Sequence, residues 1–90
     1  MAYQIRYTEA AKRDLRTLPG NYRQRVHRLI ESLPATPRPR SAKELRDRPN
    51  RFRIRVNGWR LVYRIDEDEE TILVLRVRRK AGPATYEDIE

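Results

Sequence analysis

The chain has 90 residues, the length of one small domain, so we expect a single domain over residues 1–90. It carries 21 Lys and Arg against 13 Asp and Glu, a formal net charge of +8, and 18 of the cations are arginine. This charge favours anionic partners such as nucleic acid, an acidic protein or an anionic membrane surface. Arginine also binds phosphate and carboxylate through two parallel hydrogen bonds.

The composition excludes several classes of protein. There is no cysteine, which rules out disulfide scaffolds and cysteine metal sites, and the single His27 cannot form a cluster of histidine ligands. No apolar run approaches the roughly 20 residues of a membrane span, and the N-terminus has no signal-peptide core. We therefore expect a cytoplasmic protein that has no membrane segment, metal or cofactor.

The N-terminal third predicts one strand followed by two helices. Residues 3–7, YQIRY, alternate apolar and polar side chains, which is typical of a strand with one buried face. Thr8 is suited to cap a helix over residues 9–18. Asn21 is suited to cap a second helix that ends near Leu33, with apolar residues at helical spacing. The short connection between them predicts an αα-hairpin.

Residues 34–50 contain four prolines and are expected to form a pinned loop. Within them SAKE, from Ser41 to Glu44, fits a capping box, which predicts one helical turn anchored by Leu45. The tail after Pro83 predicts a further short turn of helix. Three more strands are expected, at residues 51–56, 59–66 and 71–79.

The order of these elements predicts an α+β fold. An N-terminal strand and an αα-hairpin precede a three-stranded antiparallel meander, and the strands form one sheet with the helices packed on one face. Residues 66–70, DEDEE, would link the last two strands. Consecutive carboxylates on such a turn are more typical of a solvated loop than of a metal site.

The segment 51–64, RFRIRVNGWRLVYR, predicts a hairpin around Asn57-Gly58, because this pair favours the positive φ angles of a type I′ turn. A two-residue turn pairs Val56 with Trp59 and fixes the register of every pair before it. One face would then be apolar and covered by the helices, and it comprises Phe52, Ile54, Val56, Trp59, Leu61 and Tyr63.

The opposite face of this hairpin would be cationic. Like charges directly across two strands destabilise a sheet, so stability alone does not select this arrangement. The face is either a solvated strand surface or a surface that binds an anion, and the scarcity of carboxylates on it favours the second. Its cross-strand pairs would be Arg55 with Arg60, Arg53 with Val62, and Arg51 with Arg64.

The last strand would extend the cationic face. If its side chains alternate strictly, the residues that face the core are Leu73, Leu75 and Val77, and those on the cationic face are Arg76, Arg78 and Lys80. The second helix is also basic over residues 22–28, YRQRVHR, which is typical of a solvated face. His27 lies within it, away from the arginines.

These residues resemble the RelE branch of the RelE/ParE superfamily of toxins from bacterial toxin–antitoxin systems. The resemblance covers nearly the whole chain, through YQIRYTEAAKRDLRTLP, PRPRSAKELRDRPNRFRIRVNGWRLVYRI and VLRVRRKAGPATY. The middle block is the most specific, because basic residues flank apolar ones, a tight turn follows, and an aromatic-Arg-Leu-Val-Tyr run comes next.

The resemblance implies a toxin that cuts messenger RNA in the ribosomal A site without a metal, and that an acidic RelB-like antitoxin holds inactive. The family's catalytic residues carry over to Arg53, Arg55, Arg60, Lys80 (with Arg79 as the alternative) and Tyr86. The further residues expected to contact RNA phosphates are Arg51, Arg64, Arg76, Arg78, Arg79 and Lys43.

Cleavage by the 2′-hydroxyl requires a base, charge stabilisation at the phosphorane and a proton for the leaving oxygen. The resemblance gives the charge stabilisation to the arginines and the acid role to Lys80, while Tyr86 either removes the 2′-proton or stacks on a base. The RelE pattern prefers lysine where this chain has Arg53 and Arg55, and arginine where it has Lys80. Arginine is not deprotonated in proteins, so Arg53 and Arg55 are expected to act through charge.

Two alternatives to this interpretation remain open. The ParE branch shares the fold and poisons DNA gyrase by binding, without nuclease chemistry. Its helical hairpin tends to be longer, and its sheet lacks the basic set with a C-terminal tyrosine. The exchanges between Lys and Arg also leave open a catalytically weak module that binds nucleic acid.

Overall fold

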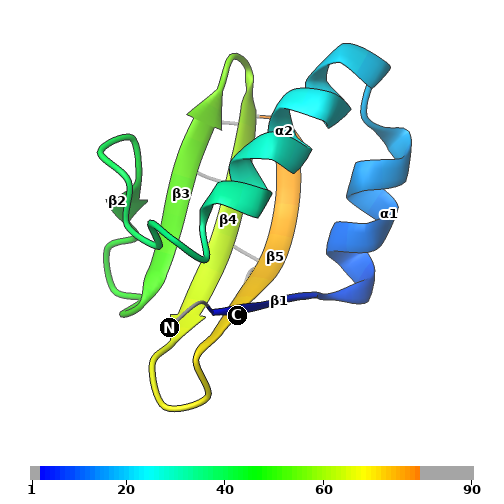
Figure 1. Cartoon of the computed structure of the whole chain (residues 1–90). Helices are drawn as coiled ribbons and strands as arrows, with labels where there is room; N and C mark the ends of the chain where they lie inside the picture. Colours follow the sequence, from blue (N-terminus) through cyan, green and yellow to red (C-terminus); the bar gives the residue numbers. More distant parts are fainter. Residues whose placement is uncertain (1–2, 80–90) are drawn as a thin grey trace.

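Two helices and a five-stranded sheet form the part of the chain that the computed structural model describes, residues 3–79 (Figure 1). The elements are β1 (Gln4–Tyr7), α1 (Glu9–Thr17), α2 (Gly20–Ser32), β2 (Lys43–Glu44), β3 (Arg51–Val56), β4 (Trp59–Asp66) and β5 (Thr71–Arg79). The strand order is β1-β5-β4-β3-β2, and only β1 and β5 pair in parallel. The predicted α+β class is confirmed, with one more strand than expected.

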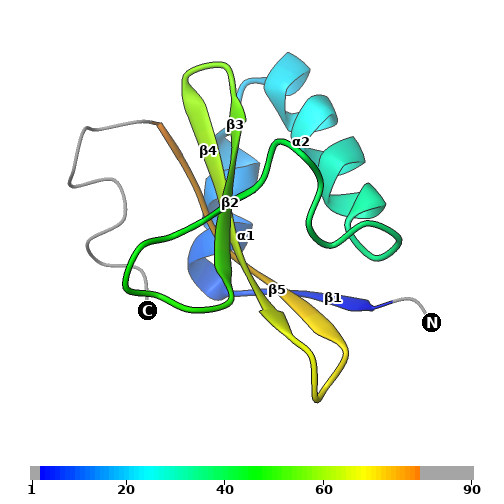
Figure 2. The same cartoon turned by 90° about the vertical axis from the view of Figure 1, so that its left-hand side faces the viewer.

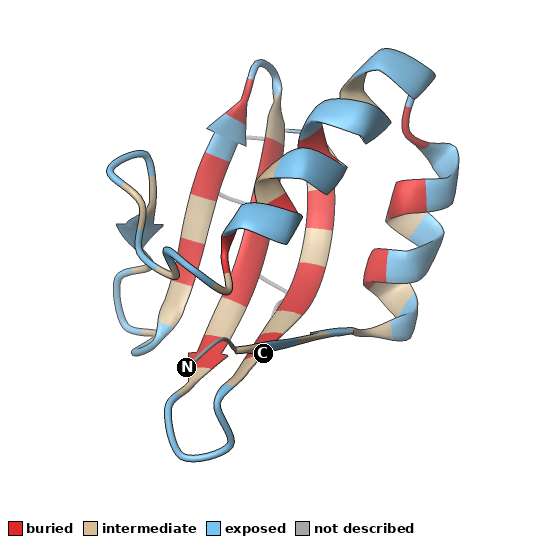
Figure 3. Cartoon of the chain, viewed as in Figure 1, coloured by how far each residue is buried: buried red, intermediate tan, exposed pale blue. Residues whose placement is uncertain are grey.

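Both helices contribute to a single core on one face of the sheet (Figures 1 and 2). The buried positions run as stripes along β3, β4 and β5 beneath α2 (Figure 3). The apolar face predicted by the alternation of residues 3–7 is present, because Tyr3, just before β1, and Ile5 and Tyr7 within it pack against this core. The buried helix residues are Ala11, Leu15, Val26 and Ile30.

The two helices begin in different ways. Thr8 caps α1 as predicted, since its hydroxyl accepts a hydrogen bond from the backbone N–H of Ala11 at 3.0 Å. The prediction that Asn21 caps α2 is wrong. The helix begins at Gly20, and Pro19, whose fixed φ suits a helix start, stands at the cap without a side-chain hydrogen bond.

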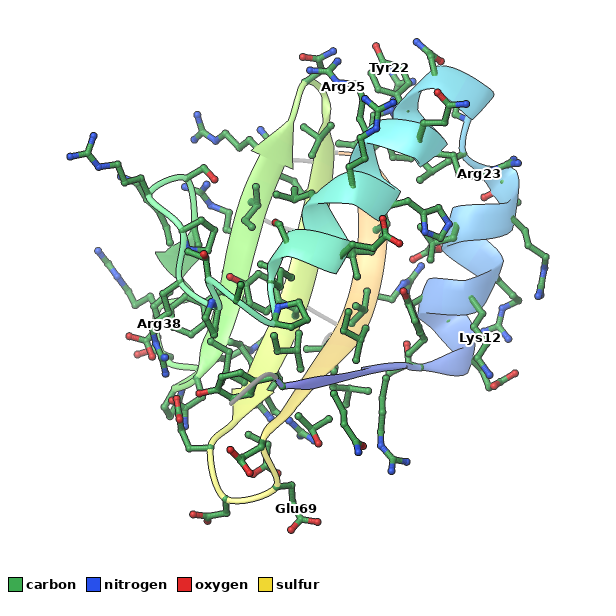
Figure 4. All side chains as sticks on the ribbon, viewed as in Figure 1. Lys12, Tyr22, Arg23, Arg25, Arg38 and Glu69 are labelled. Carbon is green, nitrogen blue, oxygen red and sulfur yellow. The ribbon has the colours of Figure 1, made fainter. Side chains whose placement is uncertain are left out.

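Arg23 fastens the start of α2 to the end of α1 (Figure 4). Its guanidinium donates hydrogen bonds of 2.9–3.0 Å to the carbonyls of Leu15, Arg16 and Leu18. The last carbonyls of a helix lack partners within it and carry partial negative charge, so a cation is well placed there. One arginine of the basic YRQRVHR segment therefore has a structural role, whereas His27 is exposed.

The predicted helical turn at residues 41–44 is wrong, because Lys43 and Glu44 form β2. They pair antiparallel with Arg53 and Phe52 of β3, and the following residue donates its backbone N–H to the carbonyl of Arg51 at 2.8 Å. Strand pairing is favoured over a helical turn because the backbone N–H and C=O groups at the edge of β3 would otherwise have no partners in the sheet. The Glu44 carboxylate accepts the backbone N–H of Asn50 at 2.9 Å.

The expectation that residues 34–50 form a pinned loop is confirmed outside β2 and is wrong at β2 itself. The Tyr63 hydroxyl donates to the carbonyl of Pro37 at 2.7 Å, and Arg38 donates to the Glu67 carboxylate at 2.7 Å. The hydroxyl of Tyr3 donates to the other oxygen of Glu67, also at 2.7 Å. These bonds join the loop to the sheet and to the acidic turn between β4 and β5 (Figure 4).

The hairpin between β3 and β4 has the predicted register. Val56 is opposite Trp59, and the pairing continues to Arg51 opposite Arg64. Asn57 has the expected positive φ of 55°, but Gly58 does not have the positive φ that a type I′ turn requires, so that part of the prediction is wrong. Its predicted apolar face is confirmed, because all six residues are in the core or packed against it.

β5 departs from strict alternation, so part of its predicted orientation is wrong. The register with β4 shifts between Val62 and Tyr63, and Leu75 is the extra residue on β5. Leu75 packs with Val62, and partly buried Leu73 joins them, in a small cluster separate from the main core. Leu73, Leu75 and Val77 were predicted to face the core, and only Val77 does. None of the helices in residues 3–79 has the length and apolar character needed to cross a membrane.

Candidate nucleic-acid interface

Cationic side chains gather on the sheet face that lies opposite the helices. Strand partners point to the same side of a sheet, so the observed register places these residues together in rows. One row runs from Lys43 through Arg53 and Val62 to Arg76, and the next contains Arg55, Arg60 and Arg78. We call this surface the arginine face, which comprises Lys43, Arg51, Arg53, Arg55, Arg60, Arg64, Arg76 and Arg78.

The centre of the arginine face is apolar. Val62 is fully buried and Leu75 is 2% exposed, and Leu45 and Leu73 pack against them. The bulge in β5 creates this centre, because it turns two leucines away from the main core. The cations therefore surround a small apolar cluster whose two central side chains are covered, so the face presents charge to a ligand.

Arg60 is the most buried cation of the face, with 6% of its surface exposed. Its Nη1 donates to the carbonyls of Asn57 at 3.0 Å and Trp59 at 2.9 Å, which fixes the guanidinium beside the hairpin turn. Those two bonds use the two hydrogens of Nη1, so three of the five N–H donors have no partner in residues 3–79. A fixed cation of this kind can stabilise negative charge without reorganising.

Four cations meet in a shallow pocket between β3 and the segment before β2. The pocket has a volume of about 290 Å³, and we call it the edge pocket; its lining comprises Arg40, Ser41, Lys43, Arg53 and Arg55. Within residues 3–79 none of these cations forms an ion pair. Arg40 and Ser41 were absent from the predicted site, because the helical turn expected there concealed their position beside β3.

Arg76 lies at the other edge of the arginine face and is paired. Its Nε donates to Asp14 Oδ2 at 2.7 Å and its Nη2 to Oδ1 at 3.2 Å, and the same carboxylate accepts the backbone N–H of Val77 at 2.9 Å. No local sequence pattern indicates this contact, because Asp14 is 62 residues away from Arg76. The structure therefore ties one predicted phosphate-binding residue to α1.

The remaining predicted residues are placed differently. Arg51 donates to the carbonyl of Pro49 at 3.0 Å. Arg79 does not join the arginine face, since its guanidinium carbon lies 5.6 Å from the ring centroid of Trp59 on the helix side. The two predicted proton-transfer residues, Lys80 and Tyr86, lie outside the described residues, as does the predicted helical turn after Pro83.

The acidic loop gives the lower end of the same face a different character. A pocket of about 490 Å³ there is lined by Arg6 and Arg64 but also by carboxylates, namely Asp66, Glu69 and Glu70. Beside it, hydrogen bonds from Arg38 and Tyr3 lower the pKa of Glu67 and keep it ionised. The arginine face therefore attracts anions beside β2, whereas the carboxylates of the loop between β4 and β5 repel them.

Comparison with known proteins supports the resemblance. The family described as "ParE toxin of type II toxin-antitoxin system, parDE" matches residues 5–82. Toxin RelG of Mycobacterium tuberculosis is 34% identical over 82 residues, which cover 90% of this chain and 94% of that protein. The mRNA interferase toxin RelE of Escherichia coli is 26% identical over 90 residues, which cover 98% and 94%.

Solved structures agree with these sequence matches. The toxin–antitoxin complex RelBE2 of Mycobacterium tuberculosis matches with a TM-score of 0.76 and 34% identity, over 89% of this chain and 100% of that chain. The intact RelBE complex of Escherichia coli matches with a TM-score of 0.80 and 25% identity, over 90% and 100%. Fold and sequence thus define a small basic protein of the toxin class of type II toxin–antitoxin systems. The chain belongs to the RelE/ParE toxin family, and its similarity is to members with RelE names.

Proposed function

We propose that this chain is the toxin of a bacterial type II toxin–antitoxin module and inhibits translation by cutting messenger RNA on the ribosome. The observation that carries the proposal is the arginine face, where Arg53 and Arg55 have no partner within residues 3–79 and lie beside the fixed Arg60. The name mRNA interferase, which the Escherichia coli relative bears, supports the same activity.

In the proposed reaction, the 2′-hydroxyl of one nucleotide attacks the adjacent phosphate and the 5′-oxygen of the next nucleotide leaves. Negative charge grows on the phosphorane, and cations that are already held in position stabilise this charge most effectively. Arg60 meets this condition through its two bonds to the hairpin turn. Arg55 and Arg78 are its cross-strand partners, so three positive charges lie in one row.

Proton transfer needs residues beyond the arginines, because guanidinium groups remain protonated. Lys80 is proposed as the acid for the leaving oxygen. Tyr86 is proposed as the base for the 2′-hydroxyl or as a platform on which a base stacks. The described part of the arginine face ends with Arg78, two positions before Lys80 in the sequence, which supports this proposed role.

An acidic antitoxin is the proposed protein partner. Solved structures similar to this chain are those of the RelBE2 and RelBE toxin–antitoxin complexes, and this chain has a net charge of +8. An acidic segment would neutralise the arginine face or displace the C-terminal segment around Tyr86, and either would block messenger RNA. The ribosome is the other proposed partner, because its polyanionic RNA backbone attracts a basic protein.

Primer extension on a reporter messenger RNA in a cell-free translation reaction, with and without ribosomes, tests the proposal. We expect cuts only with ribosomes, and a loss of about 100-fold in Arg55→Ala, the scale found when one charge-stabilising donor is removed. Arg55 is exposed and unpartnered in residues 3–79, so this change should not unfold the protein. Arg13→Ala, an exposed arginine on α1, is the matched control. Messenger RNA that stays intact in the presence of ribosomes and folded wild-type protein would refute the proposal.

Inhibition of DNA gyrase is a second candidate, and the ParE description of the matching family favours it. The helical hairpin argues against it, because α1 has 9 residues and α2 has 13, whereas a longer hairpin is expected for that branch. A supercoiling assay separates the two. Inhibition of gyrase by the wild type and equally by Arg55→Ala, without cuts in messenger RNA, would favour the second candidate.

A further inference from the structure

The edge pocket brings together four cations that form no ion pair within residues 3–79. Register places Lys43 directly opposite Arg53, and Arg55 follows two residues later on the same face. Like charges at such short range destabilise the fold when no anion lies between them. No described carboxylate relieves this repulsion, because Glu44 alternates to the other side and is bonded to the backbone of Asn50.

A hydrogen-bonded turn forms one wall of the pocket. A turn closed by the hydrogen bond from Ala42 N–H to the Pro39 carbonyl, at 2.9 Å, carries Arg40 and Ser41 at its two central positions. Ala42 packs against the main core, and Arg38, just before the turn, is bonded to Glu67. The turn therefore presents a guanidinium and a hydroxyl to the pocket from a position that is fixed at both ends.

These donors suit a phosphate better than a peptide carboxylate. The pocket offers three guanidinium groups, one ammonium group and a hydroxyl around about 290 Å³. A phosphate diester carries a full charge and accepts hydrogen bonds at several oxygens, so it can contact donors on more than one side. The exposed position of Arg40, Lys43 and Arg55 lets a polymer backbone pass across the pocket without entering a closed cavity.

We propose that the edge pocket binds one backbone phosphate of single-stranded RNA, next to the phosphate that is cut. This inference rests on the proposed function. Arg60 is fixed at the hairpin turn on β4, whereas Lys43 and the turn at Arg40 lie at the outer edge, two strands away. The pocket thus holds a neighbouring phosphate and sets the register of the RNA on the arginine face.

Binding of an RNA trinucleotide with 2′-O-methyl groups tests this inference, because such RNA cannot be cut. Affinity is measured by fluorescence anisotropy over a range of salt concentrations for wild type, Lys43→Ala and Arg40→Ala. Each variant should bind severalfold more weakly, and the logarithmic salt slope should fall by about 0.7 in magnitude, the value for one contact to a single strand. Arg13→Ala, which removes the same charge from α1, should bind as wild type does. Equal behaviour of Lys43→Ala and Arg13→Ala would overturn the inference.

A neutral methylphosphonate at each linkage in turn locates the contact. At one linkage it should weaken binding by the wild type but cause no further loss in Lys43→Ala, since both changes remove the same contact. Additive losses at every linkage would overturn the inference. So would weaker binding by Lys43→Ala of a hexaglutamate peptide but not of the RNA, which would assign the pocket to a protein partner. These binding experiments measure no cleavage. If the messenger RNA assay shows no cuts but the methylphosphonate still causes no further loss in Lys43→Ala, only the proposed function is refuted.

Discussion

One row of side chains crosses the arginine face from β2 to β5, and its two ends differ. At the β5 end, α1 supplies Asp14, which pairs with Arg76 at 2.7 Å. At the β2 end, Lys43 adds positive charge opposite Arg53. The same fold thus neutralises one end of the row and leaves the other end positive. A strand face rich in arginine therefore combines residues that stabilise the fold with residues that remain available to a ligand.

Removing the acid at the neutralised end should give the largest change in stability. Asp14→Ala leaves Arg76 and the backbone N–H of Val77 without this acceptor in a partly buried position. We expect the free energy of unfolding to fall by about 2 kcal/mol, measured by urea denaturation. Glu9→Ala, which removes an exposed ion pair with Lys12, should change it by much less. Equal effects would show that the Asp14 contact has no special role.

Loosening the segment that leads to the positive end should have an intermediate effect. Tyr63→Phe removes the hydrogen bond to the Pro37 carbonyl and should cost about 1 kcal/mol at neutral pH. Burial raises the pKa of Tyr63 from its ordinary value of 10.0 to about 12. The folded state therefore favours the neutral phenol, and this stabilisation is complete below pH 10 and lost as the pH rises toward 12.

The difference between wild type and Tyr63→Phe is measured from urea midpoints at pH 7, 9 and 11. It should stay constant from pH 7 to 9 and become smaller at pH 11, because phenylalanine does not titrate. An unchanged difference at pH 11 would contradict a raised pKa for Tyr63. The other tyrosines are present in both proteins, so their contribution cancels in the difference between the two urea midpoints at each pH.

Removing a charge at the positive end should have the smallest effect on stability, and in the opposite direction. Lys43→Ala relieves repulsion with Arg53, so its urea midpoint in low salt should rise slightly above that of the wild type. Added salt screens this repulsion and should bring the two proteins together. Lys12→Ala is the control, since Lys12 pairs with Glu9 at 3.1 Å and its loss should give no rise. A lower midpoint for Lys43→Ala would mean that the pocket is not under repulsion.

Much of the sheet could be predicted because its signals are local. Asn57-Gly58 determines the hairpin turn, and the alternation around it predicts both faces of β3 and β4. β5 was harder, because ILVL at residues 72–75 is continuously apolar and gives no phase for alternation. The bulge at Leu75 was therefore missed, and so was the apolar centre of the arginine face.

The candidate site was only partly predictable for the same reason. Arg53 and Arg55 follow from strand alternation, which acts over a few residues. β2 has two residues, too few for a periodic pattern, and its pairing depends on the open edge of β3. The contributions of Arg40 to the edge pocket and of Asp14 to Arg76 are contacts between distant segments, which the sequence pattern does not encode.

Charge reversal at two positions of the same sheet face tests the central claim most directly. Arg53→Glu changes the positive end, whereas Arg6→Glu changes an exposed arginine beside the acidic loop. Both variants are compared with wild type for inhibition of protein synthesis in a cell-free translation reaction. We predict that Arg53→Glu abolishes inhibition and that Arg6→Glu retains it. Inhibition by both variants, or its equal loss in both, would contradict the claim that RNA binds at the unpaired end of the arginine face.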